Sequence, residues 1–172
     1  MASDTIGEMR IRSFLLDIDD IEELTDLLHK AYKQLADMGL RYVATHQDST
    51  VTRRRIQDAH CLVGEISDRV IATITYYRPG LKSGCTWYRH EGIGVFGQFG
   101  VLPQFQGTGS GSKLLNAVEE MALQDGCREL ALNTAEPATH LHKYYEHRGY
   151  RIVDYVDWEG ANYRSIIMSK KL

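Results

Sequence analysis

The stretch that decides the fold runs from Val101 to Leu115 and reads VLPQFQGTGSGSKLL. An apolar segment ends at Val101, a proline turn follows, and three glycines then alternate with small hydroxyl residues up to Gly111. From Leu114 onward apolar residues recur at helical spacing, so the predicted order is strand, turn, glycine loop and helix. Glycine lets backbone N–H groups approach a ligand, and a helix N-terminus adds unpaired donors and partial positive charge. Together they predict a socket for a phosphate or pyrophosphate.

Two common phosphate motifs do not fit this loop. A P-loop places glycine just before its lysine and Ser or Thr just after it, whereas Lys113 lies between Ser112 and Leu114. The dinucleotide fingerprint has a third glycine three residues after the second, and that position is Ser112. A flexible Gly/Ser turn is the plainer alternative, but the strand and the helix on either side of the loop argue against it.

Two segments resemble the GNAT family of N-acetyltransferases. Residues 106–111 (QGTGSG) are similar to the family's Gln/Arg-x-x-Gly-x-Gly/Ala signature, and residues 101–103 (VLP) are similar to the Val-x-Pro that precedes it. Downstream, residues 145–150 (YEHRGY) are similar to the family's Tyr-Glu-x-x-Gly-Phe/Tyr. The segments have the family's order and usual separation. The resemblance covers residues 60–172 well and the first 60 residues by pattern only.

The order of elements predicts the fold class. Strands come first and helices then alternate with strands, which predicts one mixed sheet covered by helices. The GNAT resemblance implies an α/β (α+β) fold with a single, mostly antiparallel central sheet of about six to seven strands flanked by about four helices, in one domain over residues 1–172. It also implies acetyl-CoA as the donor and direct transfer of the acetyl group to an amine of a small molecule or peptide. A non-catalytic acyl-CoA-binding sensor or scaffold is the alternative.

The periodicity of apolar residues sets the expected elements. Strands are expected over residues 9–14, 61–66, 70–77, 88–101, 129–133, 150–158 and 163–169. Helices are expected over residues 21–35, 50–58, 110–125 and 137–147, the first of them capped by Asp19 or Asp20. Four glycines at positions 92, 94, 97 and 100 interrupt the strand that ends at Val101, which indicates a bulge or the close approach of a partner.

The resemblance implies which residues bind the donor. In the family this glycine-rich strand splays from its neighbour and its backbone pairs with pantetheine, while the glycine loop takes the pyrophosphate. The cofactor-binding residues expected on this basis are Phe99, Val101, Gln106, Gly107, Thr108, Gly109, Ser110, Gly111, Asn133 and Tyr145. The family often has an asparagine seven residues before the tyrosine, where this chain has Ala138. Asn133 is a substitute contact, or equally a strand-end cap.

Tyr145 is the expected general acid, because the family places a tyrosine hydroxyl here against the thioester sulfur. A phenol, with a pKa of about 10, is protonated at neutral pH and can donate its proton to a departing thiolate. The alternative is a core aromatic whose hydroxyl bonds to the backbone. The general base is less defined, since the family's glutamate position is Val95 here. Glu91 is the candidate, because its even spacing from Val101 puts both on one face if no bulge intervenes; an exposed role at the start of the strand, and a water chain as the base, are left open.

The sequence does not identify the acceptor. Its entrance is expected at the first two helices and the loop near residues 80–90. Four residues in these regions either line a pocket or pack in the ordinary way: Tyr32, His46, Trp87 and Tyr88. The Arg53-Arg54-Arg55 run is interpreted as a solvated helix face, with contact to a ligand left open.

Composition narrows the setting. Of 172 residues 43% are hydrophobic and 25% charged, and the net charge is −3, so neither a nucleic-acid nor a membrane partner is expected. Residues 1–5 (MASDT) lack the features of a signal peptide. Cys61 and Cys127 have apolar neighbours, which favours reduced core thiols and a cytoplasmic location. No metal-ligand spacing occurs among the cysteines or histidines, so no metal is expected; a homodimer is left open.

Overall fold

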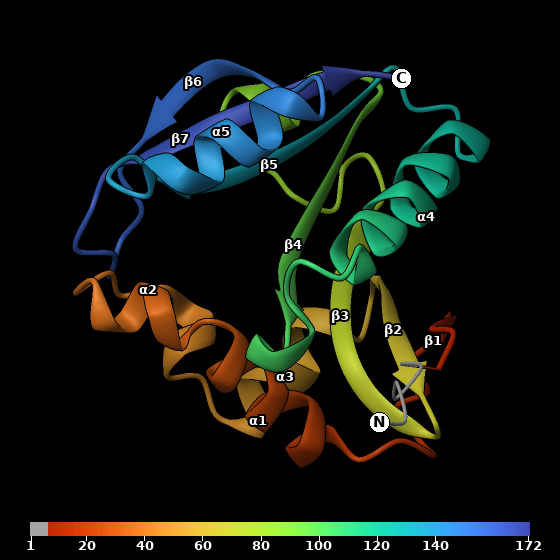
Figure 1. Cartoon of the computed structure of the whole chain (residues 1–172). Coiled ribbons are helices and arrows are strands. Elements are labelled where there is room, and N and C mark those ends of the chain that lie inside the picture. Colours follow the sequence, from red (N-terminus) through yellow and green to blue (C-terminus); the bar gives the residue numbers. More distant parts are fainter. Residues whose placement is uncertain (1–6) are drawn as a thin grey trace.

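The computed structural model describes residues 7–172, so the expectation about a signal peptide falls outside that range. A seven-stranded sheet in the order β1-β2-β3-β4-β5-β7-β6 forms the centre (Figure 1). The strands are β1 (Arg10–Ser13), β2 (His60–Ile66), β3 (Arg69–Tyr77), β4 (Ile93–Val101), β5 (Glu129–Ala135), β6 (Arg151–Val156) and β7 (Ser165–Lys171). The helices are α1 (Ile21–Ala31), α2 (Lys33–Asp37), α3 (Ser49–Ile56), α4 (Ser110–Gln124) and α5 (Thr139–His147).

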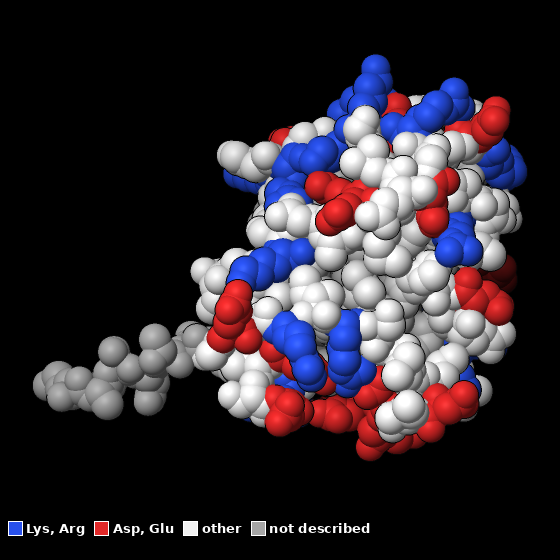
Figure 2. Space-filling model, turned by 90° about the vertical axis from the view of Figure 1, so that its right-hand side faces the viewer, with Lys and Arg blue, Asp and Glu red and all other residues white. Residues whose placement is uncertain are grey.

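The sheet is mixed and mostly antiparallel, as predicted. Among the strands of the described residues, β4 and β5 form the one parallel pair. Figure 1 shows α4 beside β2, β3 and β4, α5 over β5 and β7, and the first three helices around the other end of β4. Figure 2 shows basic and acidic side chains mixed over one face of the molecule, with acidic ones gathered along its lower edge.

β4 and β5 separate after a short paired segment. Their pairing ends at Val95 and Ala131. Beyond this point β4 continues to Val101 against β3, and β5 continues to Ala135 against β7. The edge of β4 that faces β5 is thus left without a strand partner, and Figure 1 shows the two strands diverging. This confirms the splayed strand that the GNAT resemblance implied.

A bulge and a close contact shape the splayed part of β4. The register between β3 and β4 shifts between Thr73 and Thr75. Opposite this shift, Gln98 has a φ of 46°, in the left-handed region that residues with a Cβ rarely adopt. At Gly100 an added Cβ would lie 2.7 Å from the Cβ of Ala31, so glycine is what lets α1 pack this closely on β4. The glycines of this strand were predicted to mark a bulge or a close approach, and the structure has both features beside them.

Most predicted element boundaries differ from the structure by one or two residues, and two are wrong by more. The strand expected from residue 88 begins only at Ile93, because residues 87–89 form a 3-10 turn and Gly92 turns the chain with a φ of 75°. The helix expected over residues 21–35 divides at Tyr32, which ends α1 and precedes α2. The cap at Asp20 is confirmed, since its side chain accepts a hydrogen bond from the Glu22 N–H at 2.8 Å.

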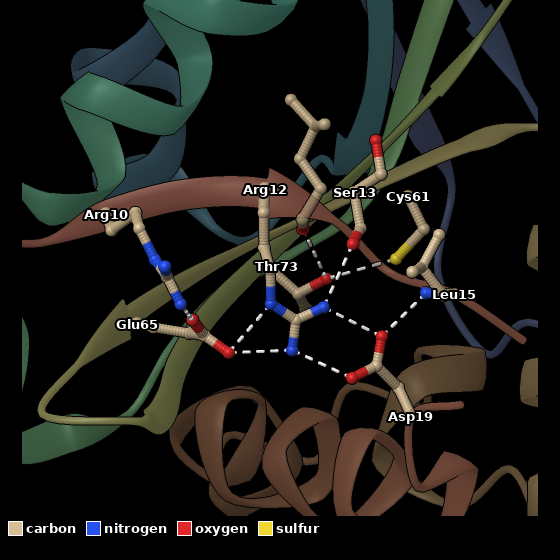
Figure 3. Close-up of polar contacts among 9 residues, drawn as sticks. Arg10, Arg12, Ser13, Leu15, Asp19, Cys61, Glu65 and Thr73 are labelled. Carbon is tan, nitrogen blue, oxygen red and sulfur yellow. Dashed lines mark hydrogen bonds and ion pairs between the residues drawn. The ribbon is translucent and has the colours of Figure 1, made fainter.

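Arg12 of β1 links the first two strands to the start of α1 (Figure 3). Its guanidinium donates to Glu65 of β2 at 2.8 Å and to both oxygens of Asp19 at 2.7 and 2.8 Å. Arg10 also pairs with Glu65 at 2.8 Å, and only 8% of the Glu65 side chain is exposed. Hydrogen bonds from Arg12 hold the pKa of the Asp19 and Glu65 carboxyls below their usual values.

We expect Arg12→Met to lower the free energy of unfolding by about 1–3 kcal/mol at neutral pH, because it removes the donor that two carboxylates share. A carboxyl whose pKa folding lowers adds stability above its unfolded-state pKa, and this stability is lost as the pH falls through its folded-state pKa. The difference between parent and variant should therefore shrink below about pH 4. Urea unfolding at several pH values measures it.

Lys33→Met is the matched control, because it removes an ion pair with Asp37 in which both side chains are more than half exposed. It should change stability by less than about 0.5 kcal/mol. A loss in Arg12→Met of equal size in acid and at neutral pH would contradict the role given to Arg12.

Candidate active site

A cavity of about 470 Å³, here termed the loop cavity, lies beside the glycine loop. Its lining comes from the region where α1 meets α2, the end of β4, the loop before α4, β5 and α5. Among them are most of the cofactor-binding residues predicted from the sequence: Phe99, Val101, Gln106, Gly107, Gly109, Gly111, Asn133 and Tyr145. The unpaired part of β4 and the glycine loop therefore border the same space.

The glycine loop presents a helix start to the loop cavity. Gly107 and Gly109 have φ values of 75° and 88°, which favour glycine, and Gly109 caps α4. The Lys113 N–H donates to the Gly109 carbonyl at 3.0 Å as α4 begins. The N–H groups of residues 110–112 come before this bond and have no acceptor inside the helix, so they are available to an anion.

Side-chain hydrogen bonds fix the loop from behind. The Thr108 hydroxyl donates to the Phe105 carbonyl at 2.6 Å and lies 2.9 Å from the Ser110 hydroxyl. The Gln106 amide donates to the Val101 carbonyl at 3.0 Å, which ties the loop to the end of β4. Thr108 and Ser110, both predicted contacts, do not line the loop cavity. Their hydroxyls hold the loop in shape instead.

Tyr145 lies on α5 and lines the loop cavity with 7% of its surface exposed. Its ring packs against Phe96 and Tyr150, whose centroids are 6.0 and 5.8 Å away. The hydrogen bonds found within residues 7–172 leave its hydroxyl unused, whereas the Tyr150 hydroxyl donates to Glu119 at 3.0 Å. Burial raises the pKa of Tyr145 well above its ordinary value, so the phenol keeps its proton at neutral pH. The hydroxyl lacks the backbone partner that a purely structural role would give it.

A second cavity, of about 600 Å³, adjoins the first and is here termed the aromatic cavity. Seven aromatic side chains line it: Tyr32, Tyr42, Tyr77, Tyr88, Phe96, Trp158 and Tyr163. Three residues, Tyr32, Tyr42 and Asn133, line both cavities. Asn133 lies within β5 and donates to the Tyr88 hydroxyl at 3.1 Å. The two cavities therefore meet where β4 and β5 diverge, and we term this place the junction.

The residues predicted near the acceptor are only partly brought together. Tyr32, His46 and Tyr88 line the aromatic cavity, whereas Trp87 does not. The Trp87 ring packs instead beside His90, with centroids 5.2 Å apart. The regions expected to form the acceptor entrance therefore supply three of these residues to the cavity lining, but not Trp87.

The arginine run divides between solvent and cavity, so its interpretation as a solvated face is wrong for one of its members. Arg53 and Arg54 are exposed, but Arg55 is half-buried and lines the aromatic cavity. Lys82, which sequence analysis did not single out, lines it too. The aromatic cavity is therefore lined by basic side chains as well as by the aromatic residues that the sequence predicted there.

Glu91 lies in the turn before β4 and lines neither cavity. Its backbone carbonyl accepts a hydrogen bond from Arg128, close to the start of β5. Its even spacing from Val101 assumed one continuous strand, but β4 starts only at Ile93 and bulges at Gln98. The geometry therefore does not support Glu91 as the general base.

A model of the acetyltransferase (GNAT) family matches residues 21–150 of the chain. The chain belongs to this family. Two curated relatives of this GNAT protein come from Bacillus subtilis (strain 168). An S-(2-succino)cysteine N-acetyltransferase is 33% identical over 133 residues, which cover 76% of this chain and 78% of that protein. An S-alkylcysteine N-acetyltransferase is 28% identical over 167 residues, which cover 92% of this chain and 87% of that protein.

Solved structures share the fold. An acetyltransferase from Streptococcus agalactiae 2603 superposes with a TM-score of 0.71 at 19% identity, over 95% of this chain and 98% of that one. A GNAT family acetyltransferase from Elizabethkingia anophelis with acetyl-CoA bound gives 0.63 at 17% identity, over 95% and 98%. Family and relatives together identify this GNAT protein as an N-acetyltransferase, which is the enzyme predicted from the sequence rather than the sensor.

Residues 7–172 contain no group of three or more His, Cys, Asp or Glu side chains arranged to hold a metal ion. None of their helices has the length and apolar character needed to cross a membrane. The single domain over residues 1–172, the cytoplasmic location and the lack of a nucleic-acid partner stay predictions.

Proposed function

We propose that this GNAT protein transfers an acetyl group directly from acetyl-CoA to the amine of a small acceptor. The observation that carries the proposal is the junction, where the loop cavity and the aromatic cavity meet beside the unpaired edge of β4. The donor enters through the loop cavity and the acceptor through the aromatic cavity, so that thioester and amine meet. The cysteine derivatives named for both curated relatives support an amino-acid amine as acceptor; a peptide amine is the alternative.

The chain's backbone binds the donor. The N–H groups at the start of α4 hold the pyrophosphate, because the helix N-terminus is a region of partial positive charge with unpaired donors. The pantetheine amides pair with the backbone of β4 near Phe99 and Val101, where a strand partner is missing. The donor's own contribution is a thioester, which activates the acetyl group for attack.

The acceptor amine attacks the thioester carbonyl, so that a C–N bond forms and the C–S bond breaks. The negative charge that develops on the carbonyl oxygen needs N–H donors, which the unpaired edge of β4 offers. Tyr145 gives its proton to the departing thiolate. Cys61, Cys85 and Cys127 line neither cavity, so the transfer passes through no acyl-enzyme. We assign the removal of the amine's proton to water in the aromatic cavity rather than to Glu91.

Release of free thiol from acetyl-CoA tests the proposal over a panel of simple amines, S-substituted cysteines and peptides, with the acetylated product identified by mass. Acetyl-CoA should also raise the melting temperature more than ATP or NAD does, because a ligand that binds only the folded state stabilises it. Stabilisation by acetyl-CoA without transfer to any amine would instead support the sensor. A larger shift with ATP or NAD would exclude both.

Gly109→Asp should weaken CoA binding by about 100-fold or more, because a carboxylate at the helix start repels the pyrophosphate. Isothermal titration calorimetry measures the affinity. Gly126→Asp is the matched control, since Gly126 follows the other end of α4 with a φ of 78° and equally open surroundings. It carries the same backbone strain and should leave CoA affinity unchanged. If Gly109→Asp bound CoA as tightly as the parent, the pyrophosphate would not bind at this loop.

Tyr145→Phe should lower kcat by about 100-fold, because general acid catalysis contributes that much or more. CoA affinity and melting temperature should hardly change, since the hydroxyl makes no hydrogen bond within the described residues. Tyr150→Phe is the crossed control: it loses the bond to Glu119 and should lose about 1 kcal/mol of stability while keeping its rate. Steady-state kinetics and thermal melts of both variants decide. If Tyr145→Phe is destabilised but turns over normally, Tyr145 is a structural residue.

A further inference from the structure

The aromatic cavity has a cationic wall made by Arg55 of α3 and Lys82 of the loop after β3. Four fully charged residues line this cavity, namely Arg41, Arg55, Lys82 and Glu159, so three positive charges face one negative charge. The whole chain, in contrast, has a net charge of −3. The positive character of the cavity is therefore a local feature of its lining.

Arg55 and Lys82 are held by no ion pair in the part of the chain that the structure describes. Neither takes part in the ion pairs formed among residues 7–172. The Lys82 ammonium instead lies 4.2 Å from the centre of the Tyr77 ring. Burial, and after it the charge of Arg55, lowers the pKa of Lys82. Two cations that repel each other in a partly buried wall are each stabilised by an anion placed between them.

A buried network fixes the guanidinium of Arg55. Its Nη1 donates to the Gln47 Oε1 at 2.6 Å, and the Gln47 amide donates in turn to Gln98 at 2.9 Å and to Thr52 at 2.7 Å. Gln47 is only 3% exposed. One of the five guanidinium N–H groups is used in this way, which leaves others in a fixed fork. Such a fork matches a carboxylate, which it can bind through two parallel hydrogen bonds.

Arg55 lines the same cavity as the junction residues Tyr32, Tyr42 and Asn133. Burial raises the pKa of Tyr32, and the positive charge of Arg55 opposes this rise. The cation and the place where the acceptor amine has to lie therefore belong to one cavity. Between them the cavity wall is aromatic, which suits an apolar body connecting an amine to an anionic group.

We propose that Arg55 and Lys82 form a carboxylate clamp, so that this enzyme selects small amines that carry a carboxylate, such as free amino acids, over neutral amines and amide-linked peptide ends. This inference rests on the proposed function, because the clamp defines which acceptors are used in the proposed acetyl transfer. Binding of the carboxylate leaves the amine free at the junction. A peptide N-terminus, whose nearest carboxyl is an amide, gives the clamp no charge to hold.

The test measures binding first and turnover second. S-methyl-L-cysteine and S-benzyl-L-cysteine, each beside its own carboxamide, are titrated in the presence of CoA. The parent should bind the acids at least about 100-fold more tightly than the carboxamides, since a site built for a charged group rejects the analogue that lacks it. In Arg55→Met, and separately in Lys82→Met, the ratio should fall to about threefold or less. In turnover the loss should lie in KM for the acids, with the carboxamides little affected.

Arg54→Met is the matched control, because it removes the same charge from an exposed position on the same helix. It should keep the full preference for acids. Unchanged CoA affinity in each variant shows that the donor site is folded. Equal binding of acid and carboxamide by the parent, binding of neither, or a preference that survives both Arg55→Met and Lys82→Met would overturn the clamp. Selective binding of the acids without acetylation of any amine would support the clamp and overturn the proposed transfer alone.

Discussion

The separation of β4 from β5 after Val95 is the constraint on which the rest of the structure depends. Inside a sheet, backbone N–H and C=O groups normally pair with the neighbouring strand, and leaving them unpaired costs free energy. Here the two strands share three paired positions and then diverge. Tyr42 lies on the β5 side of the opening, where its hydroxyl is 2.8 Å from the Thr134 hydroxyl and accepts the Ala135 N–H at 2.8 Å. Both cavities exist because the sheet is interrupted there.

The bulge at Gln98 connects this opening to the acceptor side. A residue with a Cβ in the left-handed region costs of order 1–3 kcal/mol, so its surroundings have to hold it. The Gln98 side chain, 3% exposed, accepts a hydrogen bond from Gln47, and Gln47 also accepts from Arg55. One buried chain of hydrogen bonds therefore runs from the distorted strand to the cationic wall. The bulge in the unpaired part of β4 and the position of Arg55 therefore depend on the same network.

Local backbone chemistry made the glycine loop, where we propose that the donor binds, predictable. Gly107 and Gly109 adopt left-handed conformations, which glycine favours, so the residue type itself indicates the turn. The helix start after them follows from the apolar spacing. The acceptor side depends on packing between distant segments. The signal that could have separated Arg55 from Arg53 and Arg54 is the helical stripe of α3, where Thr52 and Ile56 are buried and Arg55 lies beside them. Lys82 lies in a loop whose path no periodicity fixes. The count that made Glu91 a candidate held only for a strand without a bulge, and β4 both starts after Glu91 and bulges at Gln98.

In the proposed reaction, donor and acceptor are recognised by different chemistry. The loop cavity offers backbone N–H groups, whose positions depend on glycine conformations and a helix start rather than on side-chain identity. The aromatic cavity offers side chains from α3, from the loop after β3 and from the segment between β6 and β7. A substitution at Arg55 or Lys82 can change which anion or apolar group is accepted without moving the backbone that holds the donor. On this proposal, acceptor preference can differ among proteins that share this fold, while the proposed donor site is kept by the constraint that separates β4 from β5.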